Sequence, residues 1–240
     1  MGLIDSVCSA VGSAFSSVCS AVGSLCSFIG GAVMGGVSSL VSSFLPVLPV
    51  LGPTLEAALS VLVAVVSFLA ELFTDKPKEE KPEEIGMKAE QADKKPENFD
   101  SINDYIEYLR NEVKLDTDKL EHLSDEEKQK YQLVGLGLYI KNIEEQQGVK
   151  LDPDFFKSIP KLKDQGYEVA DIANLMQSMK NNGVTDMKQY VDFMKGDLQP
   201  GSPECQQMQL SVKDMVEQHF QGKEVNVRQE INKLADTVRE

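Results

Sequence analysis

The N-terminal part of the chain repeats a pattern of hydroxyl, small and apolar side chains every eleven positions. The string SVCSAVGS occupies residues 6–13 and returns at residues 17–24. Eleven residues make about three turns of an α-helix, so both copies would present like side chains on the same side of a helix. On a β-strand, an odd offset would place the two copies on opposite faces. The repeat therefore predicts a helix.

This helix would have one apolar face and one polar face that carries no charge. Helices that lie in a lipid interface usually carry Lys or Arg, so three arrangements stay open. The helix could adsorb weakly to lipid, insert into a bilayer with its serines against other helices, or lie buried against protein. The apolar face, predicted to contact a membrane, consists of Val7, Val11, Phe15, Val18, Val22, Leu25 and Ile29, and the polar stripe includes Ser9, Ser13, Ser20 and Ser24.

A second apolar segment, TLEAALSVLVAVVSFLAELF, occupies residues 54–73. As a helix it would be about 30 Å long, which matches the hydrocarbon thickness of a bilayer. Two glutamates near the ends of such a span are tolerable, because they can reach the headgroups or become protonated. We expect Leu62, Val66 and Leu69 to contact the membrane, and a narrow polar stripe to consist of Glu56, Ser60, Ser67 and Glu71.

The two apolar segments are separated by PVLPVLGP at residues 46–53. Three prolines and a glycine prevent a helix from continuing through this stretch. Residues 1–73 are therefore predicted to form an apolar helical hairpin that interacts with a membrane and turns near residues 46–53. Its polar stripes would face each other inside the hairpin, or line a pore.

Residues 74–100 contain 15 charged side chains and three prolines. A segment of this composition buries too little apolar surface to offset the entropy lost on ordering. The sequence therefore predicts a charged, flexible linker over residues 74–100.

From residue 101 onward, helix start and stop signals follow one another. Ser101, Ser124 and the pairs Asp152-Pro153 and Ser202-Pro203 are typical of helix N-termini, and Gly148, Gly166, Gly183 and Gly196 are typical of helix ends. The apolar residues between these signals recur at helical spacing. Residues 101–240 are therefore predicted to form one soluble, acidic, all-α domain, a bundle of about six or seven helices.

Charge is distributed very unevenly along the chain. Residues 6–55 contain no Asp, Glu, Lys, Arg or His, whereas all 24 Lys and Arg residues and 35 of the 38 acidic residues lie from residue 74 onward, with Lys76 as the first basic residue. Nucleic acid is not an expected partner, because phosphate binding needs clustered basic residues. Lys76, Lys78 and Lys81 directly follow the second apolar segment, so the positive-inside rule predicts a cytosolic location for the C-terminal domain.

The chain begins with MGLIDS, which fits the pattern for N-myristoylation at Gly2. A single acyl chain binds membranes only marginally, and Cys8 could accept a second one. The alternatives are an ordinary N-terminus and a cysteine that packs as a small apolar residue. Lipidation at Gly2 and Cys8 therefore stays a hypothesis.

Residues that carry out chemistry are sparse. His122 and His219 are the two histidines, and neither stands at a metal-ligand or catalytic-triad spacing. Both are expected on the surface. We therefore expect no catalytic residue, no metal site and no cofactor, and a protein that is not an enzyme.

The order of an MGLIDS start, a small-residue apolar segment and a charged helical part resembles the plan of membrane-penetration proteins of some viruses and of translocated bacterial effectors. No motif supports this resemblance, so it assigns no residue roles. The expected function is that of a membrane-interacting protein, oligomeric and bound to an unidentified protein partner, whose hairpin anchors it or forms a pore. It would act on a host-cell membrane or in a virion. The alternative is a structural component of a virion or a secretion machine, with its N-terminal helices packed between protein subunits.

Overall fold

The computed structural model describes residues 52–239, which form ten α-helices, one short 3-10 helix and no β-strand. The all-α prediction is therefore confirmed for this part of the chain. The first helix of the predicted hairpin, and most of its turn, lie outside the described residues. The chain divides into two compact units, of which the first ends at Gln147 and the second begins at Gly148.

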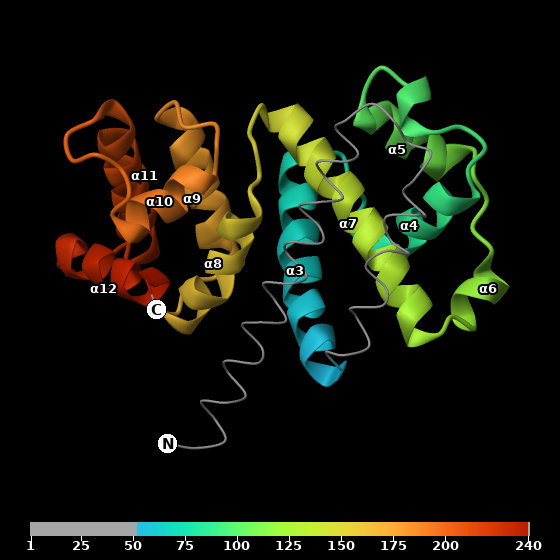
Figure 1. The fold of residues 1–240 in the computed structure, drawn as a ribbon, viewed down its shortest axis with the longest axis horizontal. Helices are drawn as coiled ribbons and strands as arrows, with labels where there is room; N and C mark the ends of the chain where they lie inside the picture. Colours follow the sequence, from blue (N-terminus) through green and yellow to red (C-terminus); the bar gives the residue numbers. More distant parts are fainter. Residues whose placement is uncertain (1–51, 240) are drawn as a thin grey trace. The chain divides into compact units, whose positions relative to one another are not determined.

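The first unit is organised around one long helix. Its elements, in chain order, are α3 (Gly52–Phe73), α4 (Pro82–Gln91), the 3-10 helix η2 (Pro96–Asn98), α5 (Ile102–Asn111), α6 (Thr117–Glu121) and α7 (Asp125–Gln147). Helix α7 packs against α3, α4 and α5, and Figure 1 shows α3 and α4 on different sides of it. Residues 133–140 of α7, LVGLGLYI, are all buried, as expected for a helix stretch that is covered all round.

Helices α4 and α7 touch through their backbones. A Cβ atom added at Gly86 would lie 2.0 Å from the backbone oxygen of Tyr131, and one added at Gly135 would lie 2.0 Å from that of Pro82. Since any side chain larger than hydrogen would collide there, the two glycines are what allows this close crossing.

The structure differs from the predicted linker at residues 74–100. Helix α4 and η2 lie within this range, and Ile85 and Met87 are fully buried. The charged side chains that suggested disorder form ion pairs with α5 and α7, such as those between Glu80 and Arg110 and between Glu90 and Lys130. Order here depends on contacts with residues far along the chain, which the composition of the segment does not show.

The second unit is a smaller helical assembly. It consists of α8 (Pro153–Asp164), α9 (Val169–Asn181), α10 (Lys188–Lys195), α11 (Pro203–His219) and α12 (Val227–Arg239). Helix α9 packs mainly on α11, and α10 contacts α8, α11 and α12. An isolated parallel bridge joins Lys150 to Asp186 and ties the segment before α8 to the segment before α10, with Lys150 N donating to Thr185 O at 2.7 Å.

Local helix signals were predicted well. Hydroxyl or carboxylate oxygens of Ser101, Asp152 and Ser202 accept hydrogen bonds from the first turns of α5, α8 and α11. Ser124 and Glu127 form the predicted capping box before α7. Helix α6 was not predicted, because it has only five residues and buries none of them.

The predicted domain boundary differs from the observed one. The sequence suggested a single domain over residues 101–240, but the chain divides after Gln147. Helices α5 and α7 belong with α3 and α4, because the apolar surface of α7 is covered by those helices.

Candidate functional site

Helix α3 is the part of the predicted hairpin that the structure describes. Leu62, Val66 and Leu69, which were predicted to contact a membrane, are completely buried. Helix α7 packs against α3 (Figure 1). In this conformation the apolar face of α3 therefore contacts protein.

The structure describes the side chains of three residues of the predicted polar stripe of α3. Ser60 and Glu71 are exposed and Ser67 is half-buried. Glu71 pairs with Lys76, at 3.5 Å between Oε1 and Nζ. The side chain of Glu56 lies outside the described residues. Among the described residues of α3, Ser60 and Glu71 are thus exposed, whereas Leu62, Val66 and Leu69 are buried by protein.

The remaining predicted site residues belong to the N-terminal segment and lie outside the described residues. They are the apolar residues Val7, Val11, Phe15, Val18, Val22, Leu25 and Ile29, the serines Ser9, Ser13, Ser20 and Ser24, and the candidate lipidation sites Gly2 and Cys8.

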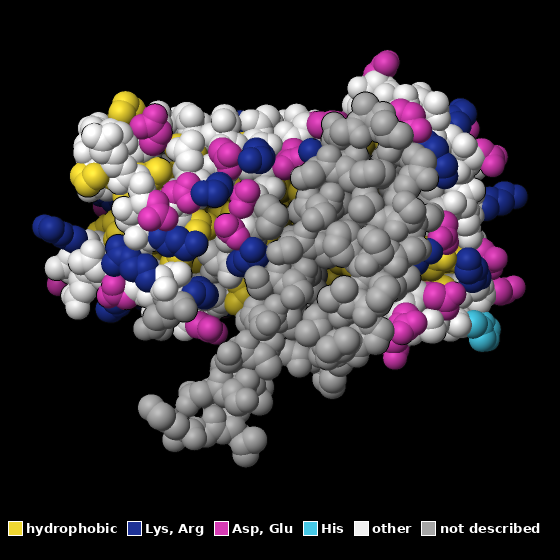
Figure 2. All heavy atoms as spheres, viewed as in Figure 1, with side chains coloured by type: hydrophobic (Ala, Val, Ile, Leu, Met, Phe, Trp, Pro, Cys, Tyr) yellow, Lys and Arg dark blue, Asp and Glu magenta, His cyan; other side chains and the backbone are white. Residues whose placement is uncertain are grey.

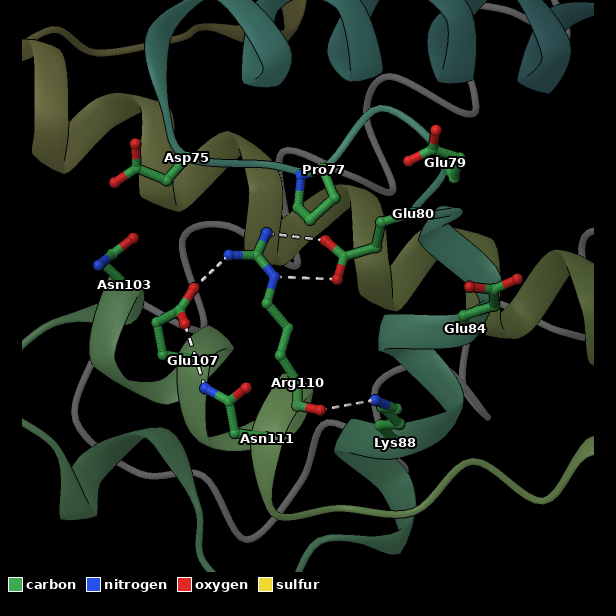
Figure 3. Close-up of a pocket in the computed structure, with 10 residues that line it drawn as sticks. All are labelled: Asp75, Pro77, Glu79, Glu80, Glu84, Lys88, Asn103, Glu107, Arg110 and Asn111. Atoms are coloured by element: carbon green, nitrogen blue, oxygen red, sulfur yellow. Dashed lines mark hydrogen bonds and ion pairs between the residues drawn. The ribbon is translucent and has the colours of Figure 1, made fainter.

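The first unit also contains an open polar pocket of about 720 Å³, between the segment that follows α3 and helices α4 and α5. Figure 3 shows its lining. Five of the lining residues are acidic and two are basic, so the pocket disfavours an anionic ligand. The lining consists of Asp75, Pro77, Glu79, Glu80, Glu84, Lys88, Asn103, Glu107, Arg110 and Asn111.

Arg110 is the central residue of this pocket. Its Nε and Nη2 donate to the two carboxylate oxygens of Glu80 at 2.9 and 2.8 Å, and its Nη1 donates to Glu107 (Figure 3). The side chains of Arg110 and Glu80 are each only 11% exposed. Burial alone would lower the pKa of Arg110, but its hydrogen bonds to Glu80 and Glu107 outweigh burial and raise that pKa above its ordinary value.

Two further groups connect this ion pair to α3 and α7. The Tyr139 hydroxyl donates to Glu80 Oε2 at 2.9 Å. The Lys76 ammonium lies 5.5 Å from the centre of the Tyr139 ring, and its side chain is only 1% exposed. Burial and the charge of Glu80 raise the pKa of Tyr139, so its hydroxyl stays protonated and keeps donating.

A second polar cluster joins α4 to α7. Glu90 of α4 accepts hydrogen bonds from Lys130 and from the Tyr131 hydroxyl. Burial would raise the pKa of Glu90, but these two hydrogen bonds and the Lys130 charge lower it overall. The cluster therefore holds a carboxylate in its ionised form at a helix crossing, which is a structural role.

In the second unit, His219 lies in a contact that the sequence did not reveal. Its Nδ1 is 2.9 Å from Asp171 Oδ2, and its ring lies 4.3 Å from that of Tyr167, centroid to centroid. His122 is exposed, as predicted, whereas His219 is half-buried. The two residues of the His219–Asp171 pair are 48 positions apart in the sequence, so no local motif could have predicted it.

Two buried tyrosines test how the hydrogen bonding of a buried hydroxyl affects stability. Tyr190 is fully buried, and its hydroxyl has no hydrogen-bond partner among the described residues. An unpaired buried hydroxyl costs about 1–3 kcal/mol. We expect Tyr190→Phe to stabilise the second unit by about 1 kcal/mol. Urea unfolding, monitored by hydrogen exchange in the second unit, provides the measurement.

The matched control is Tyr139→Phe in the first unit. Tyr139 is equally buried but donates to the Glu80 carboxylate, so removal of its hydroxyl is expected to cost about 1 kcal/mol. If both substitutions shift stability in the same direction, hydrogen bonding of the hydroxyl does not determine the effect.

Other site types have little support in the described part of the chain. Residues 52–239 contain no group of three or more His, Cys, Asp and Glu side chains that could hold a metal ion. None of the helices in this part combines the length and hydropathy needed to cross a bilayer.

The excess of acidic side chains is concentrated in the first unit. Residues 52–147 contain 22 acidic and 12 basic residues, whereas residues 148–240 contain 15 and 12. Figure 2 shows acidic and basic side chains interspersed over the face of the second unit that is in view. A basic protein surface would therefore be attracted mainly to the first unit.

Comparison with known proteins finds no matching family model, no matching curated protein and no matching solved structure.

Proposed function

We propose that this is a non-enzymatic, membrane-interacting protein. Its N-terminal segment contacts lipid, and its helical units bind a protein partner at the membrane surface. The observation that carries this proposal is the complete absence of charged residues from residues 6–55, in a chain that has 38 acidic and 24 basic residues. An uncharged segment of this length is stable at or in a lipid phase, or when covered by protein.

The proposed arrangement is a hairpin of residues 1–73 that turns near residues 46–53, with α3 as its second helix. Lys76, Lys78 and Lys81 follow α3 and would keep the two helical units on the cytosolic side. Acylation at Gly2, with or without Cys8, would strengthen this attachment. The acidic first unit would then face a basic protein partner.

Flotation of the full-length chain on vesicles of phosphatidylcholine and phosphatidylserine tests this proposal. The wild-type chain is expected to float, and Val11→Asp with Val22→Asp is expected to reduce the floating fraction at least about tenfold, because each charge enters the apolar face. The matched control places the same charges on the polar face, as Ser13→Asp with Ser20→Asp, and should float nearly as well as wild type.

Each outcome of this flotation test supports or contradicts one part of the proposal. If the wild-type chain does not float, the membrane role is wrong. If the two double variants float equally, the helical faces are wrongly assigned. Release of a trapped dye by the floating protein supports a pore, and flotation without release supports an anchor.

The alternative is a structural role in an assembly, such as a virion or a secretion machine, in which protein covers the N-terminal helices. It is favoured by the complete burial of Leu62, Val66 and Leu69 of α3 within the first unit. This alternative predicts that the full-length chain remains in lipid-free complexes with a co-expressed partner, even when vesicles are added.

A further inference from the structure

Eight residues, 74–81, connect α3 to α4 and are held in place near both of their ends. Near the start, Thr74 Oγ1 donates to Ala70 O at 2.6 Å, and Gln147 Nε2 donates to Phe73 O at 3.1 Å. Near the end, Glu80 forms its two hydrogen bonds with Arg110 of α5. The path of the chain after α3 is therefore fixed by polar contacts, although α3 itself is held mainly by apolar ones.

One side chain of α7 contacts both parts of this connection. The Tyr139 ring lies 5.5 Å from Lys76 Nζ, and the Tyr139 hydroxyl donates to Glu80 at 2.9 Å. Lys76 also donates to Pro77 O at 3.1 Å and pairs with Glu71, the last charged residue of α3. We call the set Lys76, Glu80, Arg110 and Tyr139 the connector network.

The connector network positions the chain after α3 but adds little to the stability of the first unit. Buried ion pairs gain little net stability, because the attraction between the charges is offset by their loss of hydration. They are, however, highly sensitive to the loss of one partner, which leaves a buried charge unpaired. Breaking such a network therefore removes the contacts that position the helix, while its apolar contacts remain.

We propose that the connector network keeps α3 docked on α7 away from lipid, and that its disruption releases α3 to join the membrane-bound hairpin. This inference rests on the proposed function, in which α3 is the second helix of that hairpin. The docked state buries the same leucines that the hairpin would present to lipid, so the two states exclude each other. Release of α3 would leave the crossing of α4 with α7 intact, because that crossing depends on Gly86 and Gly135.

The test is hydrogen–deuterium exchange of the full-length chain without lipid, with Glu80→Gln as the opening variant. It removes the carboxylate charge that pairs with Arg110 but keeps the size of the side chain. Exchange in residues 59–73 is expected to rise at least about tenfold, while α4 and α7 keep their wild-type protection. Glu79→Gln is the matched control, since Glu79 is the exposed neighbour of Glu80, and it should leave α3 protected.

A milder variant keeps the test valid if Glu80→Gln unfolds the first unit. Tyr139→Phe removes only the hydroxyl bond to Glu80 and should raise α3 exchange severalfold without exposing α4. Wild-type protection of α3 in both variants would overturn the proposal. Loss of protection in α3, α4 and α7 together, in both variants, would also overturn it.

Vesicle flotation separates this inference from the proposed function. The Glu80→Gln chain should float to a larger extent than wild type. If α3 becomes exposed but neither chain floats, the membrane role fails while the docking role of the network stands. If wild type floats but α3 exchange is unchanged in both variants, the membrane role stands and the connector network does not control it.

Discussion

Replacement of Gly135 by alanine is expected to destabilise the first unit by about 3 kcal/mol, at the upper end of the usual cost of overpacking. The added Cβ would lie 2.0 Å from the Pro82 backbone oxygen. The clash involves backbone on both sides, so no side-chain rotation relieves it and the two helices must move apart. Alanine is the better helix former by about 1 kcal/mol, so a net loss would show that the steric cost dominates.

The measurement is the thermal unfolding of the full-length chain, monitored by hydrogen exchange in α4 and α7. A loss of this size should lower the melting temperature of the first unit by more than about 10 °C. The control is Gly222→Ala in the second unit, where no atom lies within 4 Å of the added Cβ, although φ is +81°. That change should cost only about 1 kcal/mol and leave α4 and α7 unaffected.

Gly86→Ala tests the same crossing from the other helix. Its Cβ would lie 2.0 Å from the Tyr131 backbone oxygen, so a similar loss is expected. If α4 moves away from α7, both clashes are relieved at once. The double variant should therefore lose less stability than the sum of the losses in the two single variants. Additive losses would show that the two glycines do not report on one shared contact.

The crossing of α4 with α7 also explains which parts of the fold could be predicted from the sequence. Helix starts at Ser101, Ser124 and Ser202 depend on residues within one turn, so local patterns identify them. The order of residues 82–91 depends instead on Gly86 meeting the backbone at Tyr131, 45 positions later. A composition rule averages over the segment and does not detect such a contact.

The ion pairs of the predicted linker lead to the same conclusion. Glu80 and Arg110 are 30 residues apart, and Glu90 and Lys130 are 40 apart. In sequence, each of these charges counted toward disorder. In the structure, each is part of a contact that orders the chain. The two glycines, Gly86 in a charged segment and Gly135 in an apolar helix, were the signal that could have indicated a close crossing.

For the candidate site, periodicity predicts an apolar face and a polar face of α3 but not what surrounds them. Ser60 and Glu71 are exposed, and Leu62, Val66 and Leu69 are buried, as an amphipathic helix requires. Lipid and a protein interior are both apolar, so the same pattern fits either environment. The choice between them depends on the free energy of docking α3 on α7 relative to that of inserting it into a membrane.

Replacement of Leu69 by alanine is expected to weaken the docking of α3 on α7 strongly. Leu69 is fully buried, and loss of a buried leucine side chain typically costs about 2–5 kcal/mol, from lost transfer energy and from the cavity left behind. Leu72, on the same helix, is 55% exposed, and its replacement by alanine should change stability by less than about 0.5 kcal/mol. Urea unfolding of the two full-length variants, read by hydrogen exchange in the first unit, provides the comparison.

The same pair of variants separates docking from membrane binding. On lipid, each substitution removes a similar apolar area from α3 and weakens binding by a similar small amount. In the docked state only Leu69 loses contacts, so Leu69→Ala alone lowers the cost of leaving α7. We therefore expect Leu69→Ala to raise the floating fraction above wild type and Leu72→Ala to lower it slightly. Equal stabilities for the two variants would show that α3 is not docked on α7 in solution, whatever the flotation result.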